Sequence, residues 1–278
     1  MPWVSESASV LIGTLGPVQL PPHTCYPPAP AGIHRIIKEA TIIKTRLIPA
    51  LALLAFLAAP LLAEEKHNTL TEAEKKAGWK LLFDGKTLDG WRCYKKKDAG
   101  NWKVQDGCIY LGGPGGGDLM TAEKYGDFEF SIDWKFEQGN NSGIIYRVTE
   151  EANGPTYVSG PEMQVMHHKP DAKLGNKSGG SLYDMYAPTQ NPFKGDVWTT
   201  YKIVCHGKKI EQWVNGVKVV DVEVGSDDWN AKYAASKWKS QKLFASQDTG
   251  HIALQDHGAK IFFRNAKIRV IEKDKAAE

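Results

Sequence analysis

The fold is decided by residues 127–137, which read DFEFSIDWKFE. Aromatic and aliphatic residues alternate with polar residues along the whole stretch. Because successive side chains of a β-strand point to opposite faces, this alternation predicts a strand with one buried and one solvated face. A strand of this kind is typical of an antiparallel sheet, since parallel strands are usually apolar on both faces.

Shorter runs with strand character lie on both sides of this segment, and glycine turns join several of them. Asp106-Gly107 and Asn215-Gly216 are hairpin signals. Two short helices are expected, one over 69–77 with Thr71 as its cap and one over 226–239. About ten strands without βαβ alternation predict an all-β fold, either an antiparallel sandwich or a jelly roll. The expected strands are 79–83, 102–104, 108–111, 127–137, 144–148, 162–167, 198–206, 209–214, 217–224, 251–257 and 260–271.

A segment near the N-terminus has the composition of a targeting signal. Residues 41–63 combine the basic pair Lys44 and Arg46, an apolar run and a terminal Ala63, which predicts a secretory signal peptide. The apolar run is about 16 residues long, shorter than a membrane span needs. Cleavage would give an exported periplasmic or extracellular protein. An uncleaved anchor is the alternative, and only that case would place the protein on a membrane.

The remaining boundaries follow from composition. Residues 1–40 are rich in proline and predict a disordered extension or a wrongly assigned translation start. A short helical lead-in over 64–77 precedes a single β domain over 78–272, and residues 273–278 form a tail. The irregular stretch 168–195 is long for a loop, and its aromatic residues predict an ordered one.

Charge and cysteine content limit the function classes. The full chain has a formal net charge of +3, and residues 64–278 alone have 31 basic and 30 acidic residues, a net charge of +1. A domain so close to neutral gives no electrostatic footprint for nucleic acid. Cys93, Cys108 and Cys205 follow the signal, so they cannot all pair within one chain. Export would permit a Cys93–Cys108 disulfide, and isolated core thiols are the alternative. No zinc-binding Cys or His spacing occurs.

Two predicted strands carry hydrogen-bonding groups on one face. Glu162 and Gln164 share a face opposite Met163 and Val165, and Gln255 shares a face with His257 in the same way. Two strands of this kind predict a polar groove on the β scaffold. Tyr183 and Asp184 of the long loop are candidates to line that groove.

The ordered set of segments resembles the domain of unknown function 1080 family, described as 3-keto-disaccharide hydrolases or 3-keto-glucoside 1,2-lyases/hydratases. The resemblance covers roughly 78–272 and implies a concanavalin- and laminin-G-like jelly-roll sandwich of two antiparallel sheets. The segments that carry it are WKLLFDGKTLDGW (79–91), NSGIIYRV (141–148), EMQV (162–165), VNGVKV (214–219), GHIALQDHG (250–258) and FFRNAKIRVI (262–271). Many family members carry an aspartate soon after the Glu-x-Gln strand, where this chain has His167-His168. A role assigned to that aspartate therefore does not transfer.

The resemblance also implies a chemistry. A ketone at C3 of a sugar acidifies the C2 proton, so a base can form an enolate, the C1 oxygen can leave, and water can add. This route needs a base, a donor for the enolate oxygen and an acid for the leaving oxygen, and it does not need the paired carboxylates of ordinary glycosidases. A 3-keto-forming oxidoreductase would have to supply the sugar substrate.

On this interpretation His257 is the first candidate for the base, Glu162 is a second base or a hydroxyl acceptor, and Arg147 donates to the ketone or enolate oxygen. Each has a structural alternative: a surface or core histidine, a salt bridge between Glu162 and a basic residue, and a cross-strand ion pair of Arg147. The candidates for sugar binding are Gln164, Gln255, Asn141, Ser142, Tyr183, Asp184 and His168. The amides could instead be sheet-edge polar groups, Asn141 and Ser142 could only shape a turn, and Tyr183 could only pack in its loop.

No cofactor is expected. His167 and His168 are adjacent, so on a strand they would point to opposite faces and could not share one ion. His168 would fall on the Glu162 face and could bind a divalent metal together with His257. Two other functions fit the same fold, a non-catalytic carbohydrate-binding module and a cell-surface adhesion domain.

Overall fold

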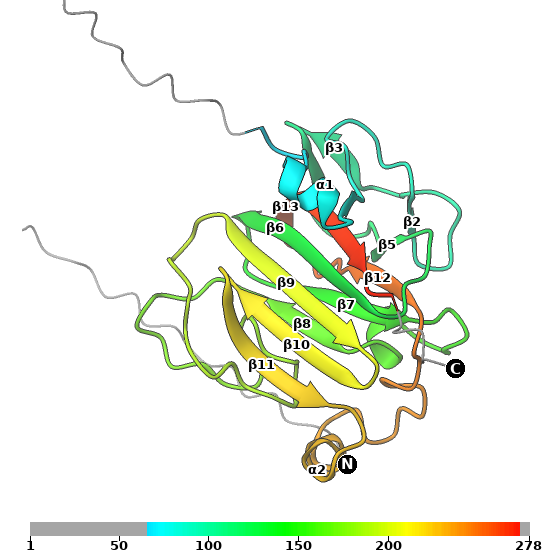
Figure 1. Cartoon of the computed structure of the whole chain (residues 1–278), viewed down its shortest axis with the longest axis vertical. Coiled ribbons are helices and arrows are strands. Elements are labelled where there is room, and N and C mark those ends of the chain that lie inside the picture. Colours follow the sequence, from blue (N-terminus) through cyan, green and yellow to red (C-terminus); the bar gives the residue numbers. More distant parts are fainter. Residues whose placement is uncertain (1–65, 273–278) are drawn as a thin grey trace, which may run out of the picture. The chain divides into compact units, whose positions relative to one another are not determined.

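Thirteen β-strands, two α-helices and one 3₁₀ turn make up the computed structural model, which describes residues 66–272 (Figure 1). The predicted extension over 1–40, the signal peptide over 41–63 and the tail over 273–278 lie outside the described residues, so they stay predictions. Within residues 66–272, no helix is long and apolar enough to cross a membrane.

The strands form two antiparallel sheets, which make a jelly-roll sandwich and confirm the predicted fold class. The larger sheet has the order β11-β10-β9-β6-β13-β4-β3, and β1 pairs with β13 beside this path. Its strands are β1 (Lys80–Leu81), β3 (Lys103–Gln105), β4 (Cys108–Gly112), β6 (Phe128–Gln138), β9 (Thr199–His206), β10 (Lys209–Val214), β11 (Val217–Glu223) and β13 (Lys260–Val270).

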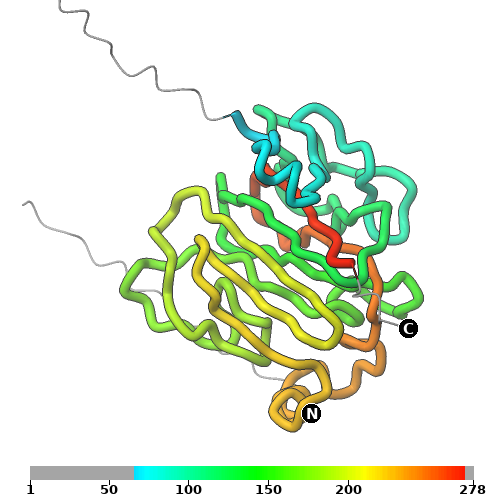
Figure 2. Tube along the Cα trace, viewed as in Figure 1, coloured from blue at the N-terminus to red at the C-terminus, as the bar shows by residue number. Residues whose placement is uncertain are grey.

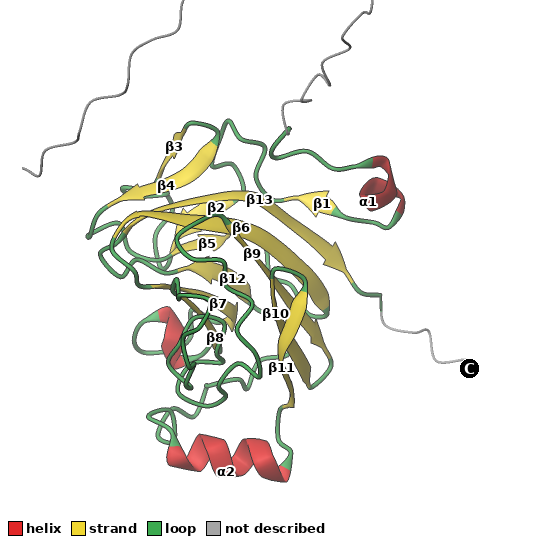
Figure 3. Cartoon of the chain, turned by 90° about the vertical axis from the view of Figure 1, so that its left-hand side faces the viewer, coloured by secondary structure: helices red, strands yellow, loops and turns green. Residues whose placement is uncertain are grey.

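The smaller sheet has the order β2-β5-β12-β7-β8. Its strands are β2 (Trp91–Cys93), β5 (Leu119–Thr121), β7 (Ser142–Val148), β8 (Glu162–Val165) and β12 (His251–Leu254). Turned by 90°, the chain shows the two sheets as separate layers, with helix α2 (Asp227–Ala235) at one end (Figure 3). The chain path between β11 and β12 passes through α2 and then runs along the edge of the sandwich to the smaller sheet (Figure 2).

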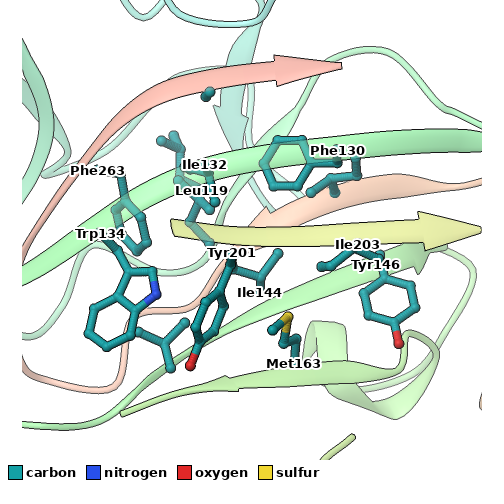
Figure 4. Packing of buried hydrophobic residues seen from close by; sticks show 14 of the residues in the cluster. Leu119, Phe130, Ile132, Trp134, Ile144, Tyr146, Met163, Tyr201, Ile203 and Phe263 are labelled. Carbon is teal, nitrogen blue, oxygen red and sulfur yellow. The ribbon is translucent and has the colours of Figure 1, made fainter. Parts of the chain in front are cut away.

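The core lies between the two sheets and is built from alternate residues of each strand. From β6, Phe130, Ile132 and Trp134 are fully buried, as the alternation of 127–137 predicts. They meet side chains of the smaller sheet, among them Ile144 on β7 and Met163 on β8 (Figure 4). Burial of so many large apolar side chains is the main stabilising contribution to this sandwich.

Both predicted helices are present, with shorter bounds than predicted. Helix α1 (Glu72–Lys76) has Thr71 as its N-cap, and Thr71 and Glu74 form a reciprocal capping box. Helix α2 has Ser226 as its N-cap and ends at Ala235, four residues before the predicted end. The three cysteines of the described part of the chain are unpaired and buried, which agrees with isolated core thiols.

The sequence prediction missed the short strands β2 and β5, whose pairing is with strands far along the chain. It also made β1 too long, which spans Lys80–Leu81 rather than 79–83, and extended two strands of the smaller sheet too far. Strand β8 ends at Val165 rather than His167, and β12 ends at Leu254 rather than His257. Both shortened ends border the polar pocket, where side chains from loops replace regular pairing.

Candidate functional site

A small polar pocket lies on the face of the five-stranded sheet that points away from the core. On β8, Met163 and Val165 pack into the core, so Glu162 and Gln164 point to this opposite face. The pocket has a volume of about 130 Å³. It is lined by Asn141, Tyr157, Glu162, Gln164, Tyr183, Lys237, Gln255 and His257.

Three buried polar side chains, Glu162, Gln164 and Gln255, form the floor of this pocket, and each is 2–6% exposed. The amide nitrogen Nε2 of Gln164 donates to Oδ1 of Asn141 at 3.0 Å. The amide oxygens Oε1 of Gln164 and Gln255 are buried without a hydrogen-bond partner among the described residues. A buried acceptor without a hydrogen bond destabilises the folded state, so we expect a ligand or water to donate to these two oxygens.

Gly143 on β7 makes room for the carboxylate of Glu162. Gly143 pairs with Gln164 across the ladder, so its missing side chain would point to the pocket face. A Cβ at this position would lie 2.5 Å from Oε1 and 2.9 Å from Cδ of Glu162. The carboxyl group therefore lies flat over the backbone of the neighbouring strand, and only glycine permits that position.

The rim opposite β8 carries an imidazole. His257 follows β12 and is exposed, and its ring nitrogens lie 3.1 Å (Nδ1) and 3.3 Å (Nε2) from Nδ2 of Asn141. Asn141 thus bridges Gln164 on the floor and His257 on the rim. Ser142 supports the same strand end, since its hydroxyl donates to the carbonyl of Gln255 at 2.8 Å.

The long loop adds an edge to the sheet beside β8. The backbone of Gln164 donates to Ser181 at 3.1 Å, and Tyr183 donates to the carbonyl of Glu162 at 2.9 Å. These bonds fix Tyr183 next to Glu162 at the pocket wall. The loop is therefore ordered, as its aromatic residues predict.

The segment after α2 brings a lysine to the rim. The backbone of Lys237 donates to Oδ2 of Asp184 at 2.8 Å, and the indole of Trp238 donates to the carbonyl of Tyr183 at 3.0 Å. Trp238 also stacks on Phe244 with ring centroids 5.0 Å apart. The ammonium of Lys237 lies 4.3 Å from the centre of the Tyr183 ring and 4.2 Å from the Trp238 ring.

Burial raises the pKa of Glu162 to about 7, and the negative charge of Asp118 contributes, whereas Lys237 opposes the shift. Lys237 is exposed at the rim, and the partial desolvation of its amine by the surrounding groups lowers its pKa, against the raising effect of Glu162. A carboxyl group with a pKa near neutrality can both accept and return a proton, which is the property of a general acid–base catalyst.

Asp256, which is held by Asp118, binds the glycine-rich loop 112–117. Oδ2 of Asp256 accepts from the backbone of Gly115 and Gly117 at 2.9 and 3.0 Å. Oδ1 of Asp118 accepts from the backbone of Asp256 at 2.9 Å, and its other oxygen accepts from the hydroxyl of Thr156. The glycines therefore have a structural role. Asp118 also acts on the pocket, because its negative charge contributes to the raised pKa of Glu162.

Arg147 does not join the pocket, so the predicted role for this residue is wrong. Its guanidinium donates to the carbonyls of Gly207 at 2.9 Å and Gly126 at 3.2 Å, and it pairs with Asp127 at 3.3 Å. The cause is a bulge: Arg147 has φ +53°, and the β7–β12 register shifts at this point. The extra residue reverses the alternation, which turns Arg147 away from the Glu162 face.

Three further candidates touch the pocket only indirectly. Ser142 positions Gln255, and Asp184 positions Lys237, as described above. His168 lies past the end of β8, where its Nε2 accepts from the backbone of Gly179 at 2.8 Å. The predicted pairing of His168 with His257 is therefore wrong, and residues 66–272 contain no group of three His, Cys, Asp or Glu side chains that could hold a metal ion.

Comparison with known proteins identifies the family. The sequence profile of the 3-keto-alpha-glucoside-1,2-lyase-like domain matches residues 78–269. A 3-keto-disaccharide hydrolase of Bacteroides thetaiotaomicron is 34% identical over 229 residues, which cover 70% of this chain and 79% of the relative. The chain belongs to this family.

Solved structures agree with membership in the 3-keto-alpha-glucoside-1,2-lyase-like family. A Parabacteroides distasonis protein proposed to be a glycosyl hydrolase superposes with a TM-score of 0.68 and 32% identity, covering 74% of this chain and 100% of that one. A second such protein from the same organism gives a TM-score of 0.53 and 26% identity, over 69% and 99% of the two chains. The chain is therefore a glycoside hydrolase-like enzyme on a jelly-roll fold.

The structure brings together six of the predicted residues and adds two that sequence reasoning missed. The six are Asn141, Glu162, Gln164, Tyr183, Gln255 and His257. Tyr157 lies in the 3₁₀ turn Thr156–Val158 and Lys237 in the turns after α2, and both were missed because the position of these connecting segments depends on long-range contacts. The family resemblance on its own gave no signal for either residue.

Proposed function

We propose that this enzyme cleaves 3-keto-glycosides by C2 proton removal, loss of the C1 oxygen and addition of water. The observation that carries the proposal is the composition of the pocket: among its described lining residues, Glu162 is the only carboxylate. Ordinary glycosidases place two carboxylic acids on either side of the scissile bond. Elimination next to a ketone needs only one base, together with a cation and an acid.

Glu162 is the base in this proposal. Its pKa of about 7 makes the carboxylate a much stronger base than an ordinary glutamate, and its burial excludes water that would compete for the proton. This assignment differs from the sequence-based one, which gave His257 first place. His257 is exposed on the rim, and there it can donate a proton to the departing C1 oxygen.

Lys237 supplies the positive charge that the developing enolate needs, the role that the sequence assigned to Arg147. It lines the same pocket as Glu162, so a ketone at C3 can face the ammonium while the neighbouring C2 proton faces the carboxylate. The amide oxygens of Gln164 and Gln255 accept hydrogen bonds from sugar hydroxyls, and the ring of Tyr183 packs on a sugar face.

The name of the Bacteroides thetaiotaomicron relative supports the substrate class. A 3-keto sugar is an oxidised sugar, so an oxidoreductase that oxidises the C3 hydroxyl of a glycoside must act earlier. That enzyme is the functional partner we propose.

The test is to incubate the purified protein with 3-keto-trehalose and, separately, with unoxidised trehalose. We expect release of glucose together with the free 3-keto sugar from the oxidised substrate, and no release of glucose from unoxidised trehalose. Glu162→Gln should lower the rate by about 10³-fold, whereas Glu223→Gln, an exposed carboxylate on β11, should leave it unchanged. Equal cleavage of both substrates, or an unaffected Glu162→Gln variant, would disprove the proposal.

A further inference from the structure

Several contacts fix the backbone around Lys237. Its backbone bonds to Asp184, and the adjacent Trp238 is fixed by a hydrogen bond to Tyr183 and by stacking on Phe244. The segment is tied down again where the backbone of Ala245 donates to Ser159 at 2.8 Å. This support fixes the position of one amine over one pocket.

The amine itself has no fixed acceptor. Among residues 66–272, no carboxylate lies within 4 Å of Nζ of Lys237 and no hydrogen bond engages it. Aromatic rings of Tyr183, Trp238 and Tyr157 stand around it at 4.3, 4.2 and 5.6 Å. Such a lysine reaches a ligand in the pocket without first breaking a salt bridge.

The neighbouring Glu162 can take up the proton of the ammonium. The surrounding ring faces attract the ammonium ion and so stabilise the protonated form of Lys237. A nearby base is therefore needed to take the proton and leave the neutral amine. Glu162 interacts with Lys237 through its charge and titrates near neutrality. An amine beside such a carboxyl group, both facing a ketone, is the arrangement that lysine nucleophiles use on carbonyl substrates.

We propose that Lys237 forms a covalent imine with the C3 ketone of the substrate. This inference rests on the proposed function and deepens it, because it replaces an electrostatic role of the ammonium with a covalent one. The expected benefit is a stronger electron sink, since a protonated imine withdraws electrons from C2 more strongly than a hydrogen-bonded ketone does.

The steps balance without any further reactant than water. Nζ attacks C3, the carbonyl oxygen takes a proton from Glu162, and loss of that oxygen as water gives the protonated imine. The Glu162 carboxylate then removes the C2 proton, and the C2–H electron pair forms the C2–C3 double bond of an enamine. The enamine expels the C1 oxygen, which takes a proton from His257, and leaves a conjugated C1–C2 double bond.

The return path restores the enzyme. Water adds at C1 and gives one proton to His257, and C2 regains a proton from Glu162. A second water hydrolyses the imine, which releases the free 3-keto sugar and Lys237. One water was released when the imine formed and two are taken up afterwards, so the net reaction is hydrolysis of the glycosidic bond by one water.

The experiment traps the imine. The full protein turns over a 3-keto-glucoside with and without sodium cyanoborohydride, which reduces a protonated imine to a stable amine. We expect progressive inactivation only with both reagents, a mass increase of one reduced sugar, and its location on Lys237 by peptide mapping. Lys237→Arg keeps the charge but cannot form an imine, so it should lose about 10³-fold in kcat and give no adduct. Lys239→Arg, an exposed lysine two residues further on, is the matched control.

Each outcome separates the inference from the proposed function. Turnover by the wild type without inactivation or adduct would overturn the imine and leave the proposed function intact. An adduct that is spread over several lysines and is unchanged by Lys237→Arg would have the same meaning. A Lys237→Arg variant that keeps most of its activity would also overturn it. Absence of turnover by the wild type would overturn both.

Discussion

The carboxylate of Glu162 lies directly over the backbone of Gly143 on the neighbouring strand, where any side chain would meet it. The distance from a Cβ at Gly143 to Oε1 of Glu162 would be 2.5 Å. Real Cβ atoms do not approach an oxygen so closely, so the glycine and the carboxylate form one structural unit. The glycine decides where the proposed base can lie.

Replacement of Gly143 by alanine should therefore displace Glu162 and leave the sheet intact. The Gly143 backbone is ordinary strand, so alanine adds no backbone strain. We expect kcat/KM to fall by about 10²-fold or more, since a misplacement of about 1 Å costs that much. Circular dichroism and thermal melting should change little. Gly175→Ala, where a Cβ meets nothing within 4 Å, is the control, and a fully active Gly143→Ala variant would contradict the geometry.

The activity should depend on pH through Glu162. Its pKa is about 7, and the base form is the carboxylate. We expect kcat/KM to rise about tenfold per pH unit below pH 7 and to level off above it. A profile measured from about pH 5 to 8 that stays flat would contradict the assignment of Glu162 as the base.

The titration of Glu162 should also change the free energy of unfolding. Stability should fall as the pH rises, whereas activity should rise. The pKa of Glu162 is about 7 in the folded protein, above its ordinary value of 4.5. The folded state therefore binds the proton more tightly, and the stability this confers is present below pH 4.5 and lost as pH rises through 7. Glu162→Gln should match the wild type near pH 4 and exceed it by up to about 3 kcal/mol near pH 8. Urea unfolding at both pH values measures the difference, and an equal gap at both would contradict it.

Strand alternation is the part of this fold that sequence could predict. The pattern of 127–137 is the observed burial pattern of β6, and the same rule placed Glu162 and Gln164 together on the pocket face. Local rules of this kind succeed because the pleat depends only on neighbouring residues. These rules predict the part of the site that β8 contributes.

The other half depends on contacts between distant segments. Lys237 reaches the pocket only because Asp184 and Tyr183 hold the chain after α2, and nothing near Lys237 in the sequence encodes that docking. The prediction for Arg147 was wrong for a local reason instead. A single positive φ inserts a bulge, and one extra residue exchanges the two faces of the strand.

Arg147 should consequently matter for stability rather than for chemistry. Its buried guanidinium satisfies the carbonyls of Gly126 and Gly207 and the carboxylate of Asp127. Arg147→Lys removes most of these bonds and leaves buried acceptors without donors, so we expect a loss of about 2–4 kcal/mol in the free energy of unfolding. The folded fraction at low temperature should keep a normal kcat. An Arg147→Lys variant that has wild-type stability but no activity would show instead that Arg147 takes part in catalysis.

His257 should matter most when the departing oxygen is a poor leaving group. It is exposed on the rim, where Asn141 orients its ring, and in our proposal it protonates the C1 oxygen. An alkoxide needs that proton, whereas a nitrophenolate leaves without it. His257→Ala should therefore lower kcat by about 10²-fold on 3-keto-trehalose and by much less on a nitrophenyl 3-keto-glucoside. An equal loss on both substrates would assign the imidazole to proton removal from C2 instead, as the sequence first indicated.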